Sequence, residues 1–271
     1  PPTPFVRPGP STNRAAVSSV VGMSTEAIDG VPIWYEELGD PTAPPLVALH
    51  GGIVTFRRSF GDVLPWLTGS RRVIGLELQG HGHTPDTGRD MSIERFADDV
   101  AELIDRIAGG GPVDVWGFSL GALTATSLAL RHPGKVDRLV LAAAHIRPDG
   151  YHPEITALEQ DDPRLPSEQE FAAWHADYEA VAPNPADFFP FLERLQPVVH
   201  DFAGWTADEI RSITAPTLLV IGDRDFVRLD HAGEMLDLFP DCRLAVLPET
   251  RHTEVMQRSD ALQALVTPFL A

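Results

Sequence analysis

The chain has 271 residues, 43% of them hydrophobic, a length typical of one large α/β domain or of one domain that carries an insertion. Its 39 acidic and 21 basic side chains give a formal charge of -18, which would repel nucleic acid and anionic membrane surfaces, so we expect neither as a partner. The chain has no apolar run of membrane-spanning length, no signal-peptide pattern at its start and a single cysteine, Cys242, so we expect a cytoplasmic protein without an internal disulfide.

The predicted elements begin with residues 1–22, a segment rich in Pro, Ser and Gly that indicates a flexible N-terminal arm. Beyond it, β-rich runs alternate with segments of helical spacing. The runs typical of strands are 33–38, 46–50, 73–77, 113–117, 138–143, 217–222 and 243–247. The segments of helical spacing are 93–108, 119–131, 231–238 and 253–270. This alternation predicts an α/β fold in which a mostly parallel central sheet has helices on both faces.

Residues 146–213 break the alternation, because they contain many prolines and aromatic residues but no β-rich run. The segment is too long for an ordinary loop, so we expect a helical lid folded over one end of the sheet. The core of the domain would then comprise residues 23–145 and 214–271. The lid aromatics have two interpretations, since they can form the core of the lid itself or face a substrate pocket.

The pentapeptide Gly117-Phe118-Ser119-Leu120-Gly121 follows a predicted strand and opens a predicted helix. In such a strand–turn–helix, a strained backbone lifts the serine hydroxyl clear of the sheet, and the flanking glycines remove side chains that would collide. The start of the helix also offers free N–H groups that stabilise negative charge. The pattern therefore marks Ser119 as a candidate nucleophile.

Other polar residues follow other predicted strands. Asp225 follows the run 217–222, His252 follows the run 243–247, and the turn His50-Gly51-Gly52 follows the run 46–50. The carboxyl ends of parallel strands lie at one edge of a sheet, so we expect these residues to meet Ser119 there. Asp223 shares the turn with Asp225, and the sequence pattern alone does not choose between the two acids.

At this point the sequence resembles the α/β-hydrolase superfamily over roughly residues 25–271, and within it the group of serine esterases, non-heme haloperoxidases and lactonases. The resemblance rests on five motifs: Leu49-His50-Gly51-Gly52, Gln79-Gly80-His81-Gly82, Gly117-Phe118-Ser119-Leu120-Gly121, Gly222-Asp223-Arg224-Asp225 and Arg251-His252-Thr253.

The resemblance implies that Ser119 is the nucleophile, His252 its base and Asp225, rather than Asp223, the acid that orients the histidine. The backbone N–H groups of Gly52 and Leu120 would hold the oxyanion. Water would complete the reaction, and neither a cofactor nor a metal is expected.

The sequence thus predicts a serine hydrolase that cleaves a small apolar or aromatic carboxylic ester or lactone through an acyl-enzyme. Alternatives within the fold are a cofactor-free perhydrolase and a carbon–carbon bond hydrolase, and a non-enzymatic alternative is a receptor-like protein that binds a small ligand. The expected pocket residues are Ile53, Phe56, Phe118, His145, Trp174, Tyr178, Phe188 and Trp205. For His145, which follows the run 139–144, a hydrogen-bonded structural role stays an equal alternative.

Overall fold

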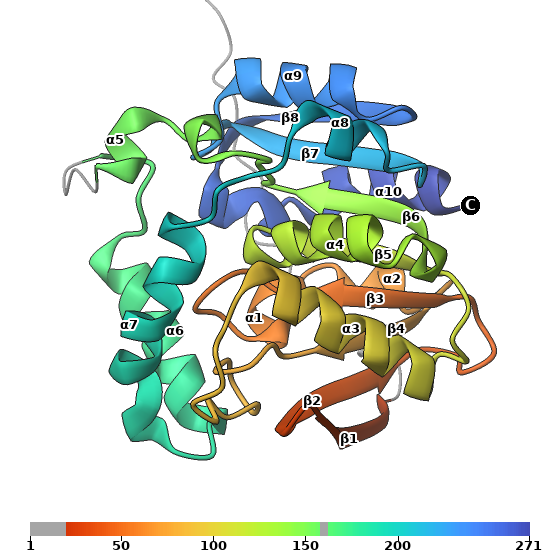
Figure 1. The fold of residues 1–271 in the computed structure, drawn as a ribbon, viewed down its shortest axis with the longest axis vertical. Helices are drawn as coiled ribbons and strands as arrows, with labels where there is room; N and C mark the ends of the chain where they lie inside the picture. Colours follow the sequence, from red (N-terminus) through yellow and green to blue (C-terminus); the bar gives the residue numbers. More distant parts are fainter. Residues whose placement is uncertain (1–19, 158–161) are drawn as a thin grey trace, which may run out of the picture.

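An eight-stranded sheet forms the centre of the computed structural model, which describes residues 20–157 and 162–271 (Figure 1). In chain order the strands are β1 (Val20–Ile28), β2 (Val31–Leu38), β3 (Pro45–Leu49), β4 (Arg72–Leu76), β5 (Val113–Phe118), β6 (Val136–Ala142), β7 (Thr217–Arg224) and β8 (Cys242–Arg251). In space they follow the order β1-β2-β4-β3-β5-β6-β7-β8. Only the pairs β1–β2 and β2–β4 are antiparallel. The predicted α/β fold is confirmed.

Helices cover both faces of this sheet. In chain order, all helices of the described residues, including those that lie on neither face, are α1 (Phe56–Phe60), α2 (Leu64–Leu67), α3 (Ile93–Ile107), α4 (Leu120–Arg131), α5 (Pro153–Thr156), α6 (Glu168–Val181), α7 (Phe188–His200), α8 (Ala207–Arg211), α9 (Leu229–Leu238) and α10 (Ser259–Leu270). Short 3₁₀ turns are η1 (Pro133–Lys135), η2 (Pro148–Gly150), η3 (Pro185–Asp187) and η4 (His252–Gln257).

The alternation of side chains along β3 shows how the two layers are built. Val47 and Leu49 pack into a core cluster with α3, α4 and α9, whereas Leu46 and Ala48 pack into a second cluster with α1, α2 and α10. Because successive strand residues point to opposite faces, an almost continuous apolar run supplies both cores. The strand runs found in the sequence were apolar for this reason.

The structure departs from the predicted elements at both ends of the described chain. Residues 20–22, expected in the N-terminal arm, begin β1, and residues 1–19 lie outside the described residues. β1 is an edge strand whose residues 22–25 are exposed, so it carries no apolar run that would identify it. The helix expected over 253–270 is divided into η4 and α10.

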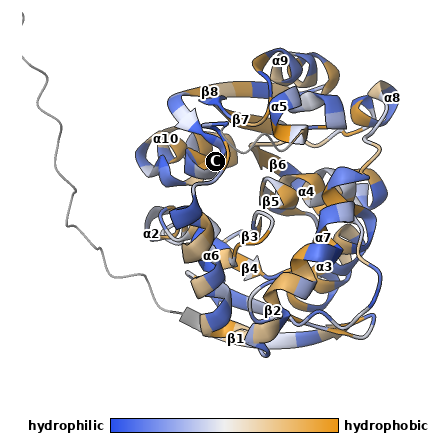
Figure 2. Cartoon of the chain, turned by 90° about the vertical axis from the view of Figure 1, so that its left-hand side faces the viewer, coloured by the Kyte–Doolittle hydropathy of each residue, from blue (hydrophilic) through white to orange (hydrophobic). Residues whose placement is uncertain are grey.

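The segment 146–213 contains α5 to α8, and α6 and α7 lie beyond one end of the sheet rather than on a face (Figure 1). Figure 2 looks onto that end, with α6 and α7 in front of the strands. Across the described ranges, no helix combines the length and apolar character needed to cross a membrane.

Gly75 in β4 lies against the ring of Phe56, and a Cβ at this position would come within 2.1 Å of that ring. Phe56, the first residue of α1, is fully buried among core side chains. The prediction that Phe56 lines the substrate pocket is therefore wrong, because its ring packs against Gly75 in the core instead.

We expect Gly75→Ala to lower the free energy of unfolding by about 1 to 3 kcal/mol, because the buried ring must shift to admit a methyl group. Urea unfolding followed by circular dichroism measures this change. Gly22→Ala in β1 is the matched control, since no atom lies within 4 Å of a Cβ built there. Equal stability of the two variants would contradict the packing described for Gly75.

Two buried histidines, one just after β6 and one in α9, are hydrogen-bonded to the backbone of residues 146–147. His145 Nδ1 donates a hydrogen bond to the carbonyl of Arg147 (2.9 Å), and the backbone N–H of Ile146 donates to His231 Nε2 (3.2 Å). Each ring thus makes a hydrogen bond that its neutral form can make. Burial lowers the pKa of His145 to about 4 and also lowers the pKa of His231.

We expect these rings to weaken the fold in mild acid. Below about pH 6.5 the unfolded chain binds a proton at each of these two histidines, whereas the folded chain does not. The stability that depends on a neutral His145 is therefore fully present above about pH 6.5 and is lost as the pH falls toward 4. For His145 alone the loss between pH 7 and 5 is about 2 kcal/mol.

Urea titrations of the unmodified chain and of His145→Gln at pH 7 and pH 5 measure this contribution. The variant should lose about 2 kcal/mol less stability over that interval, because it carries no proton at position 145. The same pH dependence in both proteins would refute a neutral buried His145.

Candidate active site

Ser119 sits in a sharp turn between β5 and α4. Its backbone has φ 53 and ψ -115, a region that non-glycine residues rarely adopt, and its N–H donates to the carbonyl of Ala142 in β6 (2.9 Å). Glycines permit the turn, because a Cβ on Gly117 would approach the Gly121 carbonyl to 2.3 Å and one on Gly121 would approach the Leu49 carbonyl to 2.1 Å. The sequence motif therefore corresponds to a strained turn at the carboxyl end of a central strand.

His252 lies at the start of η4, directly after β8, and its ring connects Ser119 with Asp225. Nε2 of His252 lies 2.9 Å from Ser119 Oγ, and Nδ1 lies 2.6 Å from Asp225 Oδ1. Both His252 and Asp225 are buried. With the Nδ1 proton donated to the carboxylate, Nε2 is free to accept the proton of the serine hydroxyl.

The structure separates the two candidate acids. Asp225 also accepts hydrogen bonds from the N–H groups of Val227 (3.2 Å) and Gly222 (3.4 Å), which hold its carboxylate toward His252. Asp223 is exposed and accepts from the N–H of Thr250 (3.1 Å). Asp225 is thus the acid that meets the histidine.

Two phenylalanine rings flank the imidazole of His252. The ring of Phe226 is stacked on it, with centroids 4.1 Å apart and planes 10° from parallel, and the ring of Phe118 lies 5.5 Å away and tilted. The flanking rings exclude water from the imidazole faces and restrict its rotation. The sequence analysis did not predict Phe226 as a site residue, although its position directly after Asp225 could have indicated it.

Gly52 and Leu120 border the space beside Ser119. Leu120 is the first residue of α4, so its N–H has no carbonyl one turn earlier to which it could donate. Gly52 lies in the turn after β3, and a Cβ built there would be 3.8 Å from Leu120. His50 shapes this turn, since its Nδ1 donates to the Gly51 carbonyl (2.7 Å) and its Nε2 accepts from the N–H of Leu78 (3.0 Å).

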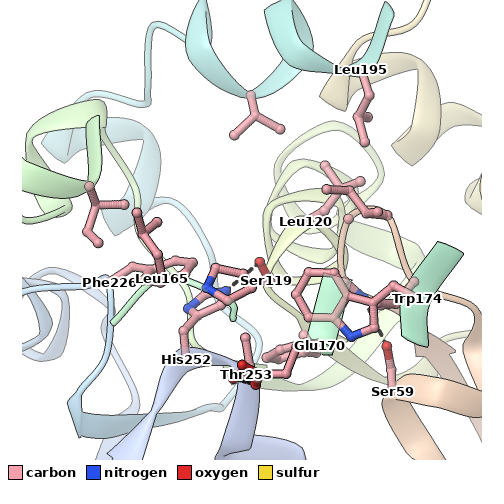
Figure 3. Close-up of a pocket in the computed structure, with 18 of the residues that line it drawn as sticks. Ser59, Ser119, Leu120, Leu165, Glu170, Trp174, Leu195, Phe226, His252 and Thr253 are labelled. Atoms are coloured by element: carbon pink, nitrogen blue, oxygen red, sulfur yellow. Dashed lines mark hydrogen bonds between the residues drawn. The ribbon is translucent and has the colours of Figure 1, made fainter. Parts of the chain in front are cut away.

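A cavity of about 600 Å³ opens onto Ser119 between the strand ends and the helices of the 146–213 segment (Figure 3). Of the residues expected in the pocket, four line it: Ile53, Phe118, His145 and Trp174. Ile53 follows Gly52 with φ 72, an unusual conformation for a β-branched residue. The aromatic residue Trp174 projects from α6 toward the cavity.

The other aromatic residues expected in the pocket do not line it. Tyr178 and Phe188 are buried between α6 and α7 with ring centroids 5.2 Å apart, and Trp205 packs against Phe202 at 4.7 Å. These predictions were wrong because a small helical segment needs its own apolar core, and its largest side chains supply it.

Glu170 of α6 is a cavity residue that the sequence did not reveal. Its carboxylate accepts hydrogen bonds from Thr253 Oγ1 (2.8 Å) and from Arg251 Nη2 (3.2 Å), the two residues that flank His252. Although partial burial raises its pKa, hydrogen bonds from Ser167, Thr253 and Arg251 lower the pKa of Glu170 to about 2. The charged carboxylate therefore ties α6 to the loop that carries the histidine.

Comparisons with known proteins agree with this architecture. The model of the Alpha/beta hydrolase family matches residues 46–267. The pimeloyl-[acyl-carrier protein] methyl ester esterase of Neisseria meningitidis serogroup C is 30% identical over 258 residues, which cover 85% of this chain and 95% of that protein. The sn-1-specific diacylglycerol lipase ABHD11 of Mus musculus is 27% identical over 92% of this chain and 89% of that protein.

Solved structures share the fold. A meta-cleavage product hydrolase from Pseudomonas fluorescens superposes with a TM-score of 0.76 at 23% identity, over 93% of this chain and 97% of that one. Since the family model matches residues 46–267, which are most of the chain, the chain belongs to the α/β-hydrolase family.

Proposed function

We propose that this protein is a serine hydrolase that cleaves a carboxylic ester or lactone of a small apolar or aromatic substrate through an acyl-enzyme. The observation that carries the proposal is the hydrogen-bonded series Ser119–His252–Asp225, whose serine and histidine line a largely apolar cavity. The esterase and lipase named among its relatives support the same reaction.

In the proposed reaction, His252 Nε2 takes the proton of Ser119 Oγ as the oxygen attacks the ester carbonyl carbon. The imidazolium that forms is stabilised by the carboxylate of Asp225, 2.6 Å from Nδ1. His252 then returns the proton to the leaving alkoxide, and an acyl-serine ester remains. Water, activated by the same imidazole, hydrolyses that ester and restores Ser119.

The carbonyl oxygen gains negative charge during the attack, and we propose that the N–H groups of Gly52 and Leu120 stabilise it. Their position beside Ser119 and the location of Leu120 at the start of α4 support this role. In comparable sites the loss of one such donor costs about 3 to 4 kcal/mol of transition-state stabilisation.

We also propose that residues 146–213 act as a lid on a core formed by residues 23–145 and 214–271. Side chains from α6 and α7, among them Trp174 and Leu195, line the cavity above Ser119. The hydrogen bonds of Glu170 with Arg251 and Thr253 support a closed position of the lid.

Hydrolysis of 4-nitrophenyl butyrate by single-site variants tests the proposal. We expect Ser119→Ala to lower kcat by about 10⁴-fold or more, and Asp225→Asn by about 10³- to 10⁴-fold, because the amide holds the histidine in the wrong tautomer. Asp223→Asn is the matched control and should stay within about threefold of the unmodified enzyme, since that carboxylate is exposed and its hydrogen bond comes from the Thr250 N–H.

Labelling by a fluorophosphonate probe, read by mass spectrometry at Ser119, accompanies the kinetics. Turnover retained in Ser119→Ala would reject Ser119 as the nucleophile. A greater loss in Asp223→Asn than in Asp225→Asn would reject Asp225 as the acid. Circular dichroism of each variant separates either result from unfolding.

A further inference from the structure

The two sides of the cavity have different chemistry. Beside Gly52 the wall is mainly aliphatic and comprises Leu120, Leu123, Leu192, Leu195 and Val199 of α4 and α7. Helix α7 also contributes the polar residues Glu193, Gln196 and His200 to the cavity lining. A Cβ built on Gly52 would lie 3.8 Å from both Leu120 and Leu195, so this wall begins at the carbonyl-binding position. Along α7 it extends from Leu192 to Val199, which is about 10 Å.

The wall on the His252 side contains aromatic rings. Phe226 is stacked on the imidazole, and the ring of Tyr151 meets Phe226 edge-on with centroids 6.1 Å apart. Leu165 and Ile155 complete this side of the cavity. Figure 3 shows Phe226 and Leu165 beside His252, and Leu120 and Leu195 on the other side of Ser119, where Trp174 of α6 also lies.

The chemistry of ester cleavage decides which part of a substrate each side receives. The carbonyl oxygen must point to the N–H groups of Gly52 and Leu120, and the leaving oxygen must lie within reach of His252 Nε2, from which it takes its proton. The alcohol group therefore extends past the imidazole. The acyl chain, the remaining substituent on the attacked carbon, extends away from His252 along α4 and α7.

Resting on the function proposed above, we propose that the substrates are esters that join a medium-length aliphatic acid to an aromatic alcohol. The acyl chain lies along the aliphatic side chains of Leu120, Leu195 and Val199 on α4 and α7. The alcohol ring lies against Phe226 and Tyr151, which provide the offset or edge-on contacts that aromatic rings prefer. Val199 and Leu165 then determine specificity on opposite sides of Ser119.

A matrix of four esters tests this assignment: methyl acetate, phenyl acetate, methyl octanoate and phenyl octanoate, with acid release followed by pH-stat. Each kcat/KM is divided by the rate constant for alkaline hydrolysis of the same ester, because phenoxide leaves more readily than methoxide whatever the enzyme binds. After this division we expect the value of the unmodified enzyme to be highest for phenyl octanoate, with a gain of about tenfold or more from the octanoyl chain and again from the phenyl ring. A preference for the methyl esters over the phenyl esters at equal acyl chain would overturn the aromatic side of the proposal.

Val199→Trp and Leu165→Trp form a matched pair, because each adds the same ring to a partly exposed wall position. Val199→Trp should lower the octanoate-to-acetate ratio of kcat/KM about tenfold and leave the phenyl-to-methyl ratio unchanged, whereas Leu165→Trp should do the reverse. The opposite pattern, or no change of either ratio in folded variants, would refute the assignment of the two sides.

Fluorophosphonate labelling of Ser119 in all three proteins separates this inference from the function on which it rests. An unmodified enzyme that is neither labelled nor active on any of the four esters would refute the hydrolase function itself. An enzyme that is labelled and active, but whose two variants keep both ratios, would refute only the division of the cavity.

Discussion

The site depends on one backbone constraint, the strained turn at Ser119. A residue with φ 53 at the end of a central strand persists only because its surroundings hold it, and here the carbonyl of Ala142 accepts its N–H while Gly117 and Gly121 let β3, β5 and α4 approach closely. The turn places half-buried Ser119 at the carboxyl edge of the sheet, where it lines the cavity. Without that approach, the hydroxyl and the imidazole would not meet.

Charged groups join the helices beyond the sheet to the same edge. Glu170 of α6 binds Arg251 and Thr253, and between these two residues stands His252. The position of α6 and the position of the imidazole are therefore linked by one carboxylate. Since its pKa is held at about 2, this link stays charged throughout the neutral range.

The apolar and aromatic side chains of the cavity complete this arrangement by limiting water around the reacting groups. Phe226 is stacked on the imidazole of His252, and the tilted ring of Phe118 lies 5.5 Å from it. A low-dielectric environment strengthens the attraction between Asp225 and a protonated His252. The same cavity offers a substrate a mainly aliphatic wall beside Gly52 and a wall with aromatic rings beside His252.

The sequence by itself determined most of the strands, the serine turn and the chain order of Ser119, the acidic turn at 222–225 and His252. These depend on local patterns: apolar runs, flanking glycines and residues placed directly after strands. The exposed edge strand β1 and the stacked Phe226 lacked such a pattern. Only the tertiary structure decided between Asp225 and Asp223, and only it divided the aromatic residues into those that line the cavity, such as Trp174, and those that fill a core, such as Phe56, Tyr178, Phe188 and Trp205. The physical reason is that the direction of a side chain depends on the neighbours it packs against, and those neighbours come from distant parts of the chain.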